Sequence, residues 1–300
     1  MIKDNLLVDK YDYCFVGSGA ILAELLKTQD LRNLKILVIS NQFIQNRSLA
    51  FDNNQVTVIS RRYFLNSRIK YEIENLIILT KSHRWEDTSE FFKVMHALRE
   101  QVSKTVVHIS SGSVYGNMSR RGNEATPTLP ISKYGKSKVT EEEIVLDQFK
   151  FSQNVIVLRV SNVYGNLIFD DIVNNCIRAI EKKETVLIFL NGTLVRDFLF
   201  LDCLVSAIIK LLGSEFLDHE TYFNVSSGQS TSIAELVAKI ELLTGSTVKR
   251  IDGSFDSGVI EYSVLDNSKL LSTISWNPLS LESGLTRYFE RDYRGMVNVK

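Results

Sequence analysis

Residues 13–23 read YCFVGSGAILA, in which a short apolar run, Tyr13–Val16, is followed by Gly17 and Gly19. Apolar residues with helical spacing come directly after the second glycine. This order predicts a buried strand, a tight glycine turn and the first turn of a helix. In a doubly wound sheet, such a turn lets the backbone approach the pyrophosphate of a dinucleotide, and the helix N-terminus offers unpaired N–H donors.

The glycine turn therefore yields a first group of candidate cofactor-binding residues: Gly17, Ser18, Gly19, Ala20 and Ile21. The usual dinucleotide fingerprint has a third glycine three residues after the second, and here that position is Leu22. Taken alone, the pattern therefore fits an ordinary strand–helix connection as well as a dinucleotide site.

Further apolar runs rich in valine and isoleucine alternate with segments of helical spacing over the first 160 residues. Each run is apolar nearly throughout, as expected for strands buried on both faces of a parallel sheet. The predicted strands are Lys35–Ile39, Val56–Ile59, Leu76–Leu79, Thr105–Ile109 and Val155–Val160, and the predicted helices are Ala20–Gln29, Ser89–Val102 and Gly135–Phe149. The alternation predicts an α/β fold with a doubly wound parallel sheet.

The pattern becomes mixed after about residue 165. A single predicted strand, Thr185–Phe189, lies among predicted helices at Asp170–Lys182, Leu201–Leu212 and Thr231–Leu243. We therefore expect a dinucleotide-binding domain at residues 1–165, with parts of residues 195–230 packing back on it. Residues 166–300 should form a smaller, mixed C-terminal lobe that binds the substrate.

Composition excludes several classes of function. The 300 residues carry 35 Lys and Arg against 35 Asp and Glu, so no basic excess indicates binding to nucleic acid. No apolar stretch reaches the ~20 residues needed to span a membrane. The three cysteines and four histidines have no metal-ligand spacing, so we expect no metal site. The few, scattered cysteines favour a cytoplasmic protein.

A second motif reads YGKSK and places Tyr134 and Lys138 four residues apart, on one face of a helix. A neighbouring ammonium group favours the phenolate form of a tyrosine and makes it a usable acid–base group. Such a pair also occurs by chance on helix surfaces. Ser111, at the C-terminal end of an apolar strand, strengthens the interpretation because active sites of α/β sheets form at that edge.

The segment after the second predicted strand bears on the choice of cofactor. NAD sites usually place an acidic residue there, but this chain has Ser40 and Asn41. Arg47, Arg61 and Arg62 follow, and arginines in this region favour a 2′-phosphate, so NADP(H) is favoured and NAD(H) is the alternative. The arginines could equally be ordinary surface charges. Glu141, Glu142 and Glu143 are predicted to form a solvated helix face.

Four motifs together resemble the extended short-chain dehydrogenase/reductases, in the branch that acts on nucleotide sugars. They are SSGSVYG at 110–116, YGKSK at 134–138, LRVSNVYG at 158–165 and GTLVRDF at 192–198. The resemblance implies a Rossmann fold and a homodimer. It also implies that Tyr134 is the acid–base group, that Lys138 holds the nicotinamide ribose, and that Ser111 binds the reacting sugar oxygen.

The same resemblance assigns the remaining site residues. Asn162 and Arg196 would bind the diphosphate of a nucleotide-diphosphate sugar, and Ser113 would contact the sugar. Asn41 and Thr80 stand at strand ends where the family binds its cofactor, although the family's usual residues there are replaced.

Three functions remain open at this point. Reduction of a 4-keto sugar nucleotide is favoured, because the altered adenosine pocket points to an exchanging NADP(H). The alternative is a C4 epimerase with tightly bound NAD, and the rival from another class is a non-catalytic dinucleotide sensor or scaffold. Dehydration is disfavoured because Gly112 and Ser113 replace the Asp-Glu pair that the family's dehydratases carry.

Overall fold

The computed structural model describes residues 8–41, 55–67, 69–80, 88–151, 154–166, 171–214, 222–253 and 259–293. Contacts group the chain into two compact units that interleave along the sequence. The first comprises Met1–Ser110, Ser137–Leu158 and Glu215–Tyr222, and the second comprises Ser111–Lys136, Arg159–Ser214 and Phe223–Lys300. The expected division at residue 165 stays a prediction.

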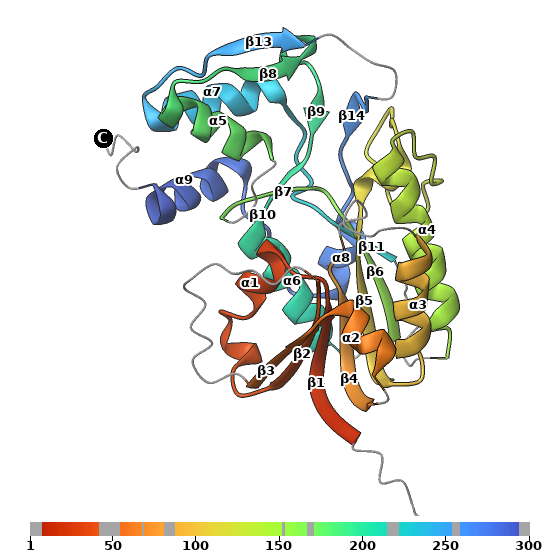
Figure 1. Ribbon diagram of the computed structural model, residues 1–300. Helices are drawn as coiled ribbons and strands as arrows, with labels where there is room; N and C mark the ends of the chain where they lie inside the picture. The colour runs from red at the N-terminus through yellow and green to blue at the C-terminus, as the bar shows by residue number, and fades with distance from the viewer. Residues whose placement is uncertain are drawn as a thin grey trace, which may run out of the picture. The chain divides into compact units, whose positions relative to one another are not determined.

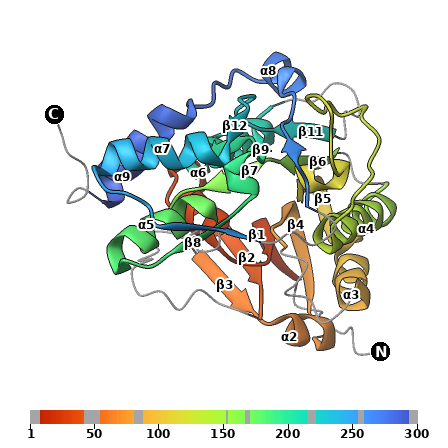
Figure 2. The ribbon, with the colours of Figure 1, turned by 90° about the horizontal axis from the view of Figure 1, so that it is seen from above.

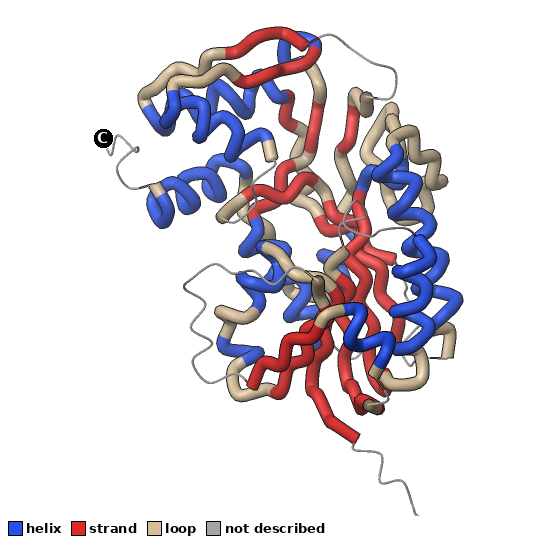
Figure 3. The backbone as a smooth tube through the Cα atoms, viewed as in Figure 1, coloured by secondary structure: helices blue, strands red, loops and turns tan. Residues whose placement is uncertain are grey.

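The first feature of the fold is a seven-stranded sheet with the order β11-β6-β5-β4-β1-β2-β3. Neighbouring strands from β5 to β3 in this order pair in parallel. The strands are β1 (Val8–Val16), β2 (Lys35–Ile39), β3 (Gln55–Ile59), β4 (Lys70–Ile78), β5 (Val102–Ser111), β6 (Asn154–Val160) and β11 (Tyr222–Val225). Figure 3 shows how strands and helices alternate along the chain, which confirms the predicted doubly wound sheet.

One strand differs from the sequence prediction in its burial. The run predicted at Val56–Ile59 was expected to be buried on both faces, but every residue of β3 is exposed or half-buried. It stands last in the sheet order, so it has one strand neighbour, whereas β2 lies between two strands and is almost fully buried. An apolar run can thus belong to an edge strand, which its sequence alone does not reveal.

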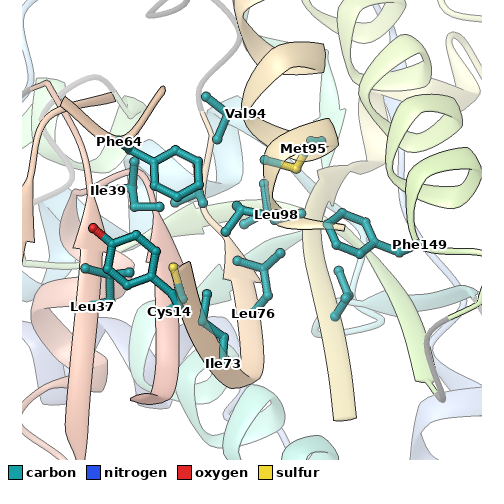
Figure 4. Packing of buried hydrophobic residues seen from close by; sticks show 14 of the residues in the cluster. Cys14, Leu37, Ile39, Phe64, Ile73, Leu76, Val94, Met95, Leu98 and Phe149 are labelled. Atoms are coloured by element: carbon teal, nitrogen blue, oxygen red, sulfur yellow. The ribbon is translucent and has the colours of Figure 1, made fainter. Parts of the chain in front are cut away.

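Helices α1 (Ala20–Leu25), α2 (Arg61–Asn66), α3 (Thr88–Leu98) and α4 (Lys133–Gln148) connect these strands. Figures 1 and 2 show α3 and α4 side by side along one face of the sheet. Figure 4 shows the core beneath them, where Phe64, Met95 and Phe149 pack over the strand residues Cys14 and Leu76. Burial raises the pKa of the Cys14 thiol, which is consistent with a structural thiol.

The second unit contains shorter elements. Strands β8 (Val186–Phe189) and β13 (Arg250–Gly253) pair in parallel, and α5 (Ile172–Lys182), α7 (Ile233–Thr244) and α9 (Leu281–Asp292) belong to the same unit (Figure 1). Its remaining elements are β7 (Asn162–Tyr164), β9 (Val195–Arg196), β10 (Phe198–Phe200), α6 (Leu201–Leu212), β12 (Thr231–Ser232), β14 (Tyr262–Ser263), α8 (Ser268–Thr273) and the 3₁₀ turns η3 (Gly112–Tyr115) and η4 (Leu190–Gly192).

Local signals explain where the helices of this unit begin and end. Ser232 accepts a hydrogen bond from the Glu235 N–H, and the Glu235 carboxylate accepts one in return from the Ser232 N–H, which forms a capping box at the start of α7. Gly245 adopts the left-handed conformation after the last turn of α7. Among the described helices, none combines the length and apolarity needed to cross a bilayer.

Candidate active site

The glycine turn between β1 and α1 lets its own backbone lie close to neighbouring groups. Gly17 has a φ of +104°, and its N–H donates to the Ile39 carbonyl at 2.9 Å. A Cβ at Gly17 would lie 2.7 Å from the Leu79 carbonyl oxygen, so a side chain is excluded there. A Cβ at Gly19 would meet nothing within 4 Å, which leaves the backbone of this turn open on one side. The turn therefore fits a dinucleotide, whose pyrophosphate needs such an approach.

We expect Gly17→Ala to lower the free energy of unfolding by roughly 1–3 kcal/mol and to weaken dinucleotide binding, because the residue is strained and the Leu79 carbonyl must move. Chemical denaturation and quenching titration with NADH measure the two effects. Gly213→Ala is the matched control, since a Cβ there would make only an ordinary 3.6 Å contact at negative φ. Equal stability losses in both variants would contradict the assignment.

The segment after β2 contains hydroxyl and amide groups rather than a carboxylate. The Ser18 and Ser40 hydroxyl oxygens lie 3.0 Å apart, and the Asn41 Oδ1 accepts from the Arg61 N–H at 3.0 Å. The Arg61 guanidinium is mostly buried and pairs with Glu90 at 2.9 Å. Arg61 is thus an internal ion-pair partner, which removes it from the three arginines proposed to receive a 2′-phosphate. Arg62 is exposed, and Arg47 lies outside the described residues.

Lys138 is 1% exposed and makes a dense set of contacts within the first unit. Its ammonium group donates to the Thr80 carbonyl at 2.8 Å, to the Ile109 carbonyl at 3.0 Å and to the Glu141 Oε2 at 2.8 Å. Thr80 also donates its hydroxyl hydrogen to the same Glu141 oxygen at 2.7 Å. The segment just after β4, strand β5 and the next turn of α4 therefore fix the position of the lysine.

The prediction that Glu141, Glu142 and Glu143 form a solvated face of α4 is wrong for two of the three. Glu141 and Glu142 are 4% and 3% exposed, and only Glu143 faces solvent. Glu141 pairs with Lys138, and Glu142 accepts a hydrogen bond from the Ser110 hydroxyl of β5. The run of three acids hid this division, because burial of a carboxylate depends on partners that only the fold supplies.

Ser111, Ser113 and Tyr134 lie together in the second unit. Ser111 ends β5, and its hydroxyl oxygen accepts from the N–H and the hydroxyl of Ser113 at 3.2 and 3.0 Å. A Cβ at Gly135 would lie 2.5 Å from the Ser113 carbonyl oxygen, so the first turn of α4 packs tightly on this serine segment. Tyr134 is the neighbouring residue and is 42% exposed. The tight packing thus brings the first turn of α4, which carries Tyr134, against the segment that carries Ser113.

The two residues predicted to bind the diphosphate of the substrate also belong to the second unit. Asn162 of β7 donates its side-chain N–H to the Asp197 carbonyl at 3.1 Å and is exposed. The guanidinium of Arg196 donates to the carbonyls of Val195, Ile260 and Glu261. Within the described ranges no carboxylate pairs with Arg196, and burial lowers its pKa from the usual value. Its charge is therefore held by neutral carbonyl groups, an arrangement that suits an anionic ligand.

The sequence analysis quoted Asp197 within a motif but assigned it no role. It is fully buried, and its carboxylate accepts from Ser161, from the N–H and hydroxyl of Ser227, and from the Gly228 N–H. These contacts tie the loop after β11 to the segment that carries Asn162. The available sequence signal was the acidic residue directly after Arg196. The structure shows that Arg196 does not pair with it, because the guanidinium donates to backbone carbonyls instead.

Burial raises the pKa of Asp197 to about 6 from its ordinary 3.8, although its hydrogen bonds oppose the shift. Because the folded chain holds this proton more tightly than the unfolded chain, the contribution to stability is complete below about pH 4 and is lost as the pH rises through about 6. We expect Asp197→Asn to remove this dependence. Wild type should therefore lose up to roughly 3 kcal/mol relative to the variant between about pH 4 and pH 7.

Urea denaturation of wild type and Asp197→Asn at the two pH values measures that difference. Asp266→Asn is an informative comparison, because hydrogen bonds from Ser268 lower the pKa of Asp266 and its contribution is lost as the pH falls. The two variants should therefore differ from wild type with opposite pH trends. A pH-independent difference for Asp197→Asn would count against a raised pKa.

Comparison with known proteins shows a similarity to one family. The model of the NAD dependent epimerase/dehydratase family matches residues 84–226, a range that includes Ser111, Tyr134, Lys138, Asn162 and Arg196. The matched range covers slightly less than half of the chain, and over it the chain is similar to the NAD dependent epimerase/dehydratase family. This similarity agrees with the seven-stranded parallel sheet and with the glycine turn at its first strand.

Relatives within this family differ in their reactions. The dTDP-L-rhamnose 4-epimerase of Burkholderia thailandensis is 28% identical over 54% of this chain and 46% of its own length. The dTDP-4-dehydro-6-deoxyglucose reductase of Escherichia coli is 28% identical over 66% of this chain and 63% of its own length. The chain thus spans about half to two thirds of these relatives.

A solved structure confirms the fold over nearly the whole chain. MoeE5 in complex with UDP-glucuronic acid and NAD has a TM-score of 0.80, with 22% sequence identity, and the match covers 95% of this chain and 99% of that one. At this identity the likeness concerns the fold. Among the described residues of this chain, no group of three or more His, Cys, Asp or Glu is gathered as a metal site.

Proposed function

We propose that this chain is an NAD(P)-dependent oxidoreductase that reduces the 4-keto group of a nucleotide-diphosphate sugar. The observation that supports the proposal is the close packing of Gly135, the residue after Tyr134, on Ser113, whose hydroxyl donates to Ser111. Lys138 follows on the same face of α4 with its ammonium buried. Acid, hydroxyl donors and cation are the groups that reduction of a carbonyl requires.

Each residue has one task in the proposed reaction. The Ser111 hydroxyl donates a hydrogen bond to the sugar carbonyl oxygen, and Tyr134 delivers the proton that this oxygen needs as the C=O bond becomes C–OH. The dinucleotide, when bound, supplies the hydride to the carbonyl carbon. The Lys138 ammonium favours the phenolate that remains on Tyr134, and the glycine turn at Gly17 accepts the pyrophosphate.

The other end of the substrate would be held through its diphosphate. The Arg196 guanidinium has no carboxylate partner among the described residues. Its planar group can donate two parallel hydrogen bonds to two phosphate oxygens. Asn162 adds an exposed amide on β7. Asp197 keeps the two in register, because its carbonyl binds Asn162 and its backbone continues from Arg196.

C4 epimerisation with retained NAD is the second candidate, and the Arg61–Glu90 pair favours it, because that pair removes one argument for a 2′-phosphate. The lack of a carboxylate at Ser40 and Asn41 still supports NADP(H) and net reduction. Both reactions use the same tyrosine and lysine. The homodimer and the cytoplasmic location stay predictions.

Identification of the dinucleotide tests this choice. One sample of the purified protein is denatured, and any nucleotide that it releases is identified. A second, native sample is titrated in parallel with NADPH and NADH. A site that prefers NADPH and reduces 4-keto nucleotide sugars supports the reductase. Stoichiometric NAD with interconversion of 4-epimers establishes the epimerase instead. If neither dinucleotide binds, the proposed oxidoreductase is overturned and the non-catalytic role gains support.

A further inference from the structure

All three N–H donors of the Lys138 ammonium group are bound by the protein itself. The Thr80 carbonyl accepts at 2.8 Å, the Ile109 carbonyl at 3.0 Å and the Glu141 carboxylate at 2.8 Å. The two carbonyls are neutral, so Glu141 is the acceptor that opposes the charge of the lysine. Its Oε2 also accepts from the Thr80 hydroxyl at 2.7 Å, which holds the carboxylate in place.

This ion pair lies beside the glycine turn that is proposed to accept the pyrophosphate. Thr80 directly follows Leu79, whose N–H donates to the Val16 carbonyl at 2.9 Å. The Leu79 carbonyl oxygen is the atom that would lie 2.7 Å from a Cβ at Gly17. All these residues belong to the first unit and stand where β1 and β4 end. The pair and the turn therefore share the carboxyl edge of the sheet, where ligands of such folds bind.

Separating the lysine from Glu141 is unfavourable because both side chains are almost fully buried. The Nε2 of His108 lies 3.6 Å from the Glu141 Oε2, and neither ring nitrogen has a hydrogen-bond partner among the described residues. Burial, and then the Lys138 charge, hold the pKa of His108 well below its usual value, so the ring is neutral and does not replace the lysine. Without Lys138, Glu141 would be a buried carboxylate held by the neutral Thr80 hydroxyl, which is strongly disfavoured.

A dinucleotide would compete with Glu141 for the same cation. Its phosphates are anionic and its ribose hydroxyls accept hydrogen bonds, so an ammonium group at this edge of the sheet attracts both kinds of group. Each N–H donor that Lys138 gives to a ligand must first leave a protein acceptor, and the nearby carboxylate repels the phosphates. The ion pair therefore disfavours the bound dinucleotide.

We propose that Glu141 is a positioning residue that weakens dinucleotide binding by keeping the Lys138 ammonium on protein acceptors. The inference rests on the proposed function, because it concerns the dinucleotide of that reaction. Weak binding suits net reduction, in which the oxidised dinucleotide leaves after each turnover and a reduced one replaces it. An epimerase that retains its NAD would gain nothing from an opposing carboxylate.

Titration with NADH and NADPH tests this inference without any sugar substrate. The Kd for each dinucleotide is measured by fluorescence quenching for wild type, Glu141→Gln and Glu143→Gln, after dialysis to remove exchangeable nucleotide. The glutamine at position 141 keeps the size of the side chain and one acceptor oxygen, and it removes the charge that opposes Lys138. Glu143 is the matched control, because it lies on the same helix two residues later and faces solvent.

We expect the Kd of Glu141→Gln to be on the order of tenfold lower than that of wild type, the factor that one charge-assisted hydrogen bond contributes. Glu143→Gln should leave the Kd within about twofold, since solvent and salt screen an exposed charge. A role of Glu141 in stability alone predicts equal or weaker binding after its replacement, so the direction of the change separates the two roles. An equal or higher Kd in folded Glu141→Gln overturns the inference.

Folding of each variant is checked by circular dichroism. If Glu141→Gln does not fold, Glu141→Asp takes its place, because the shorter side chain withdraws the carboxylate from the ammonium. A Kd that does not fall in the aspartate variant then overturns the inference.

The titration also separates this inference from the proposed function. If wild type and Glu141→Gln bind a dinucleotide equally tightly, the role of Glu141 is refuted and the reductase is not affected. If neither protein binds NADH or NADPH, the inference falls together with the proposed oxidoreductase. Binding by Glu141→Gln together with weaker or undetectable binding by wild type supports the role of Glu141.

Discussion

Tyr134→Phe is expected to reduce turnover of the nucleotide sugar by about 10²–10⁴-fold, the usual contribution of a positioned acid–base group. The phenylalanine keeps the aromatic ring and removes only the hydroxyl, whose proton the carbonyl oxygen would receive. Because the hydroxyl has no role in holding the pyrophosphate, the Kd for the dinucleotide should change little. Steady-state kinetics with the sugar that the assay identifies, together with NADPH and NADH titration, measure the two quantities.

Tyr63→Phe is the matched control for this experiment. Tyr63 is 52% exposed on α2. Its backbone N–H donates to the Ser60 hydroxyl oxygen, and the replacement leaves this hydrogen bond in place. Its replacement should leave kcat within about twofold, as expected for a surface change without partners. Turnover that survives Tyr134→Phe would remove the tyrosine from the chemistry and would favour the non-catalytic role of the chain.

Lys138→Met is expected to lower the free energy of unfolding by about 3–5 kcal/mol, because it leaves the Glu141 carboxylate buried without its cation. The pair is almost fully shielded from water, so solvent cannot replace the missing partner. Denaturation in urea at neutral pH measures this loss. The second variant, Lys138→Met with Glu141→Gln, should recover much of the stability, since both buried charges are then absent.

Lys136→Met provides the comparison for a lysine of the same helix. Lys136 is exposed two residues before Lys138, and its replacement should change the free energy of unfolding by no more than about 0.5 kcal/mol. If Lys138→Met were as stable as wild type, or if the double variant were less stable than the single one, the lysine and the glutamate would not be coupled as the contacts indicate.

Several parts of the fold followed from the sequence because they depend on local patterns. The strand at Lys35–Ile39 and the helix at Leu201–Leu212 have the predicted bounds, and Ser232 and Gly245 begin and end α7 as cap residues do. Other elements differ in length. The strand predicted at Tyr13–Val16 extends back to Val8, since pairing with β4 continues along residues whose own composition is mixed.

The sequence could not show which charged side chains of a helix face an ion-pair partner on another element. Arg61 was one of three arginines that could have been either a ligand of a cofactor phosphate or a surface charge, but it pairs with Glu90, 29 residues later. The prediction missed this because an ion pair between α2 and α3 depends on how the two helices pack. The same limit applies to Glu141, whose burial becomes visible only when β4 and β5 lie against α4.

The doubly wound sheet, the glycine turn at Gly17 and the spacing of Tyr134 and Lys138 could be predicted from the sequence, because turn chemistry and helix periodicity are properties of neighbouring residues. The partners of the charged groups depend on the packing of distant elements: Lys138 binds Glu141, Arg61 binds Glu90, and Asp197 binds the loop at Ser227. The physical reason is that a buried charge is tolerated only where distant strands and helices bring hydrogen-bond partners to it.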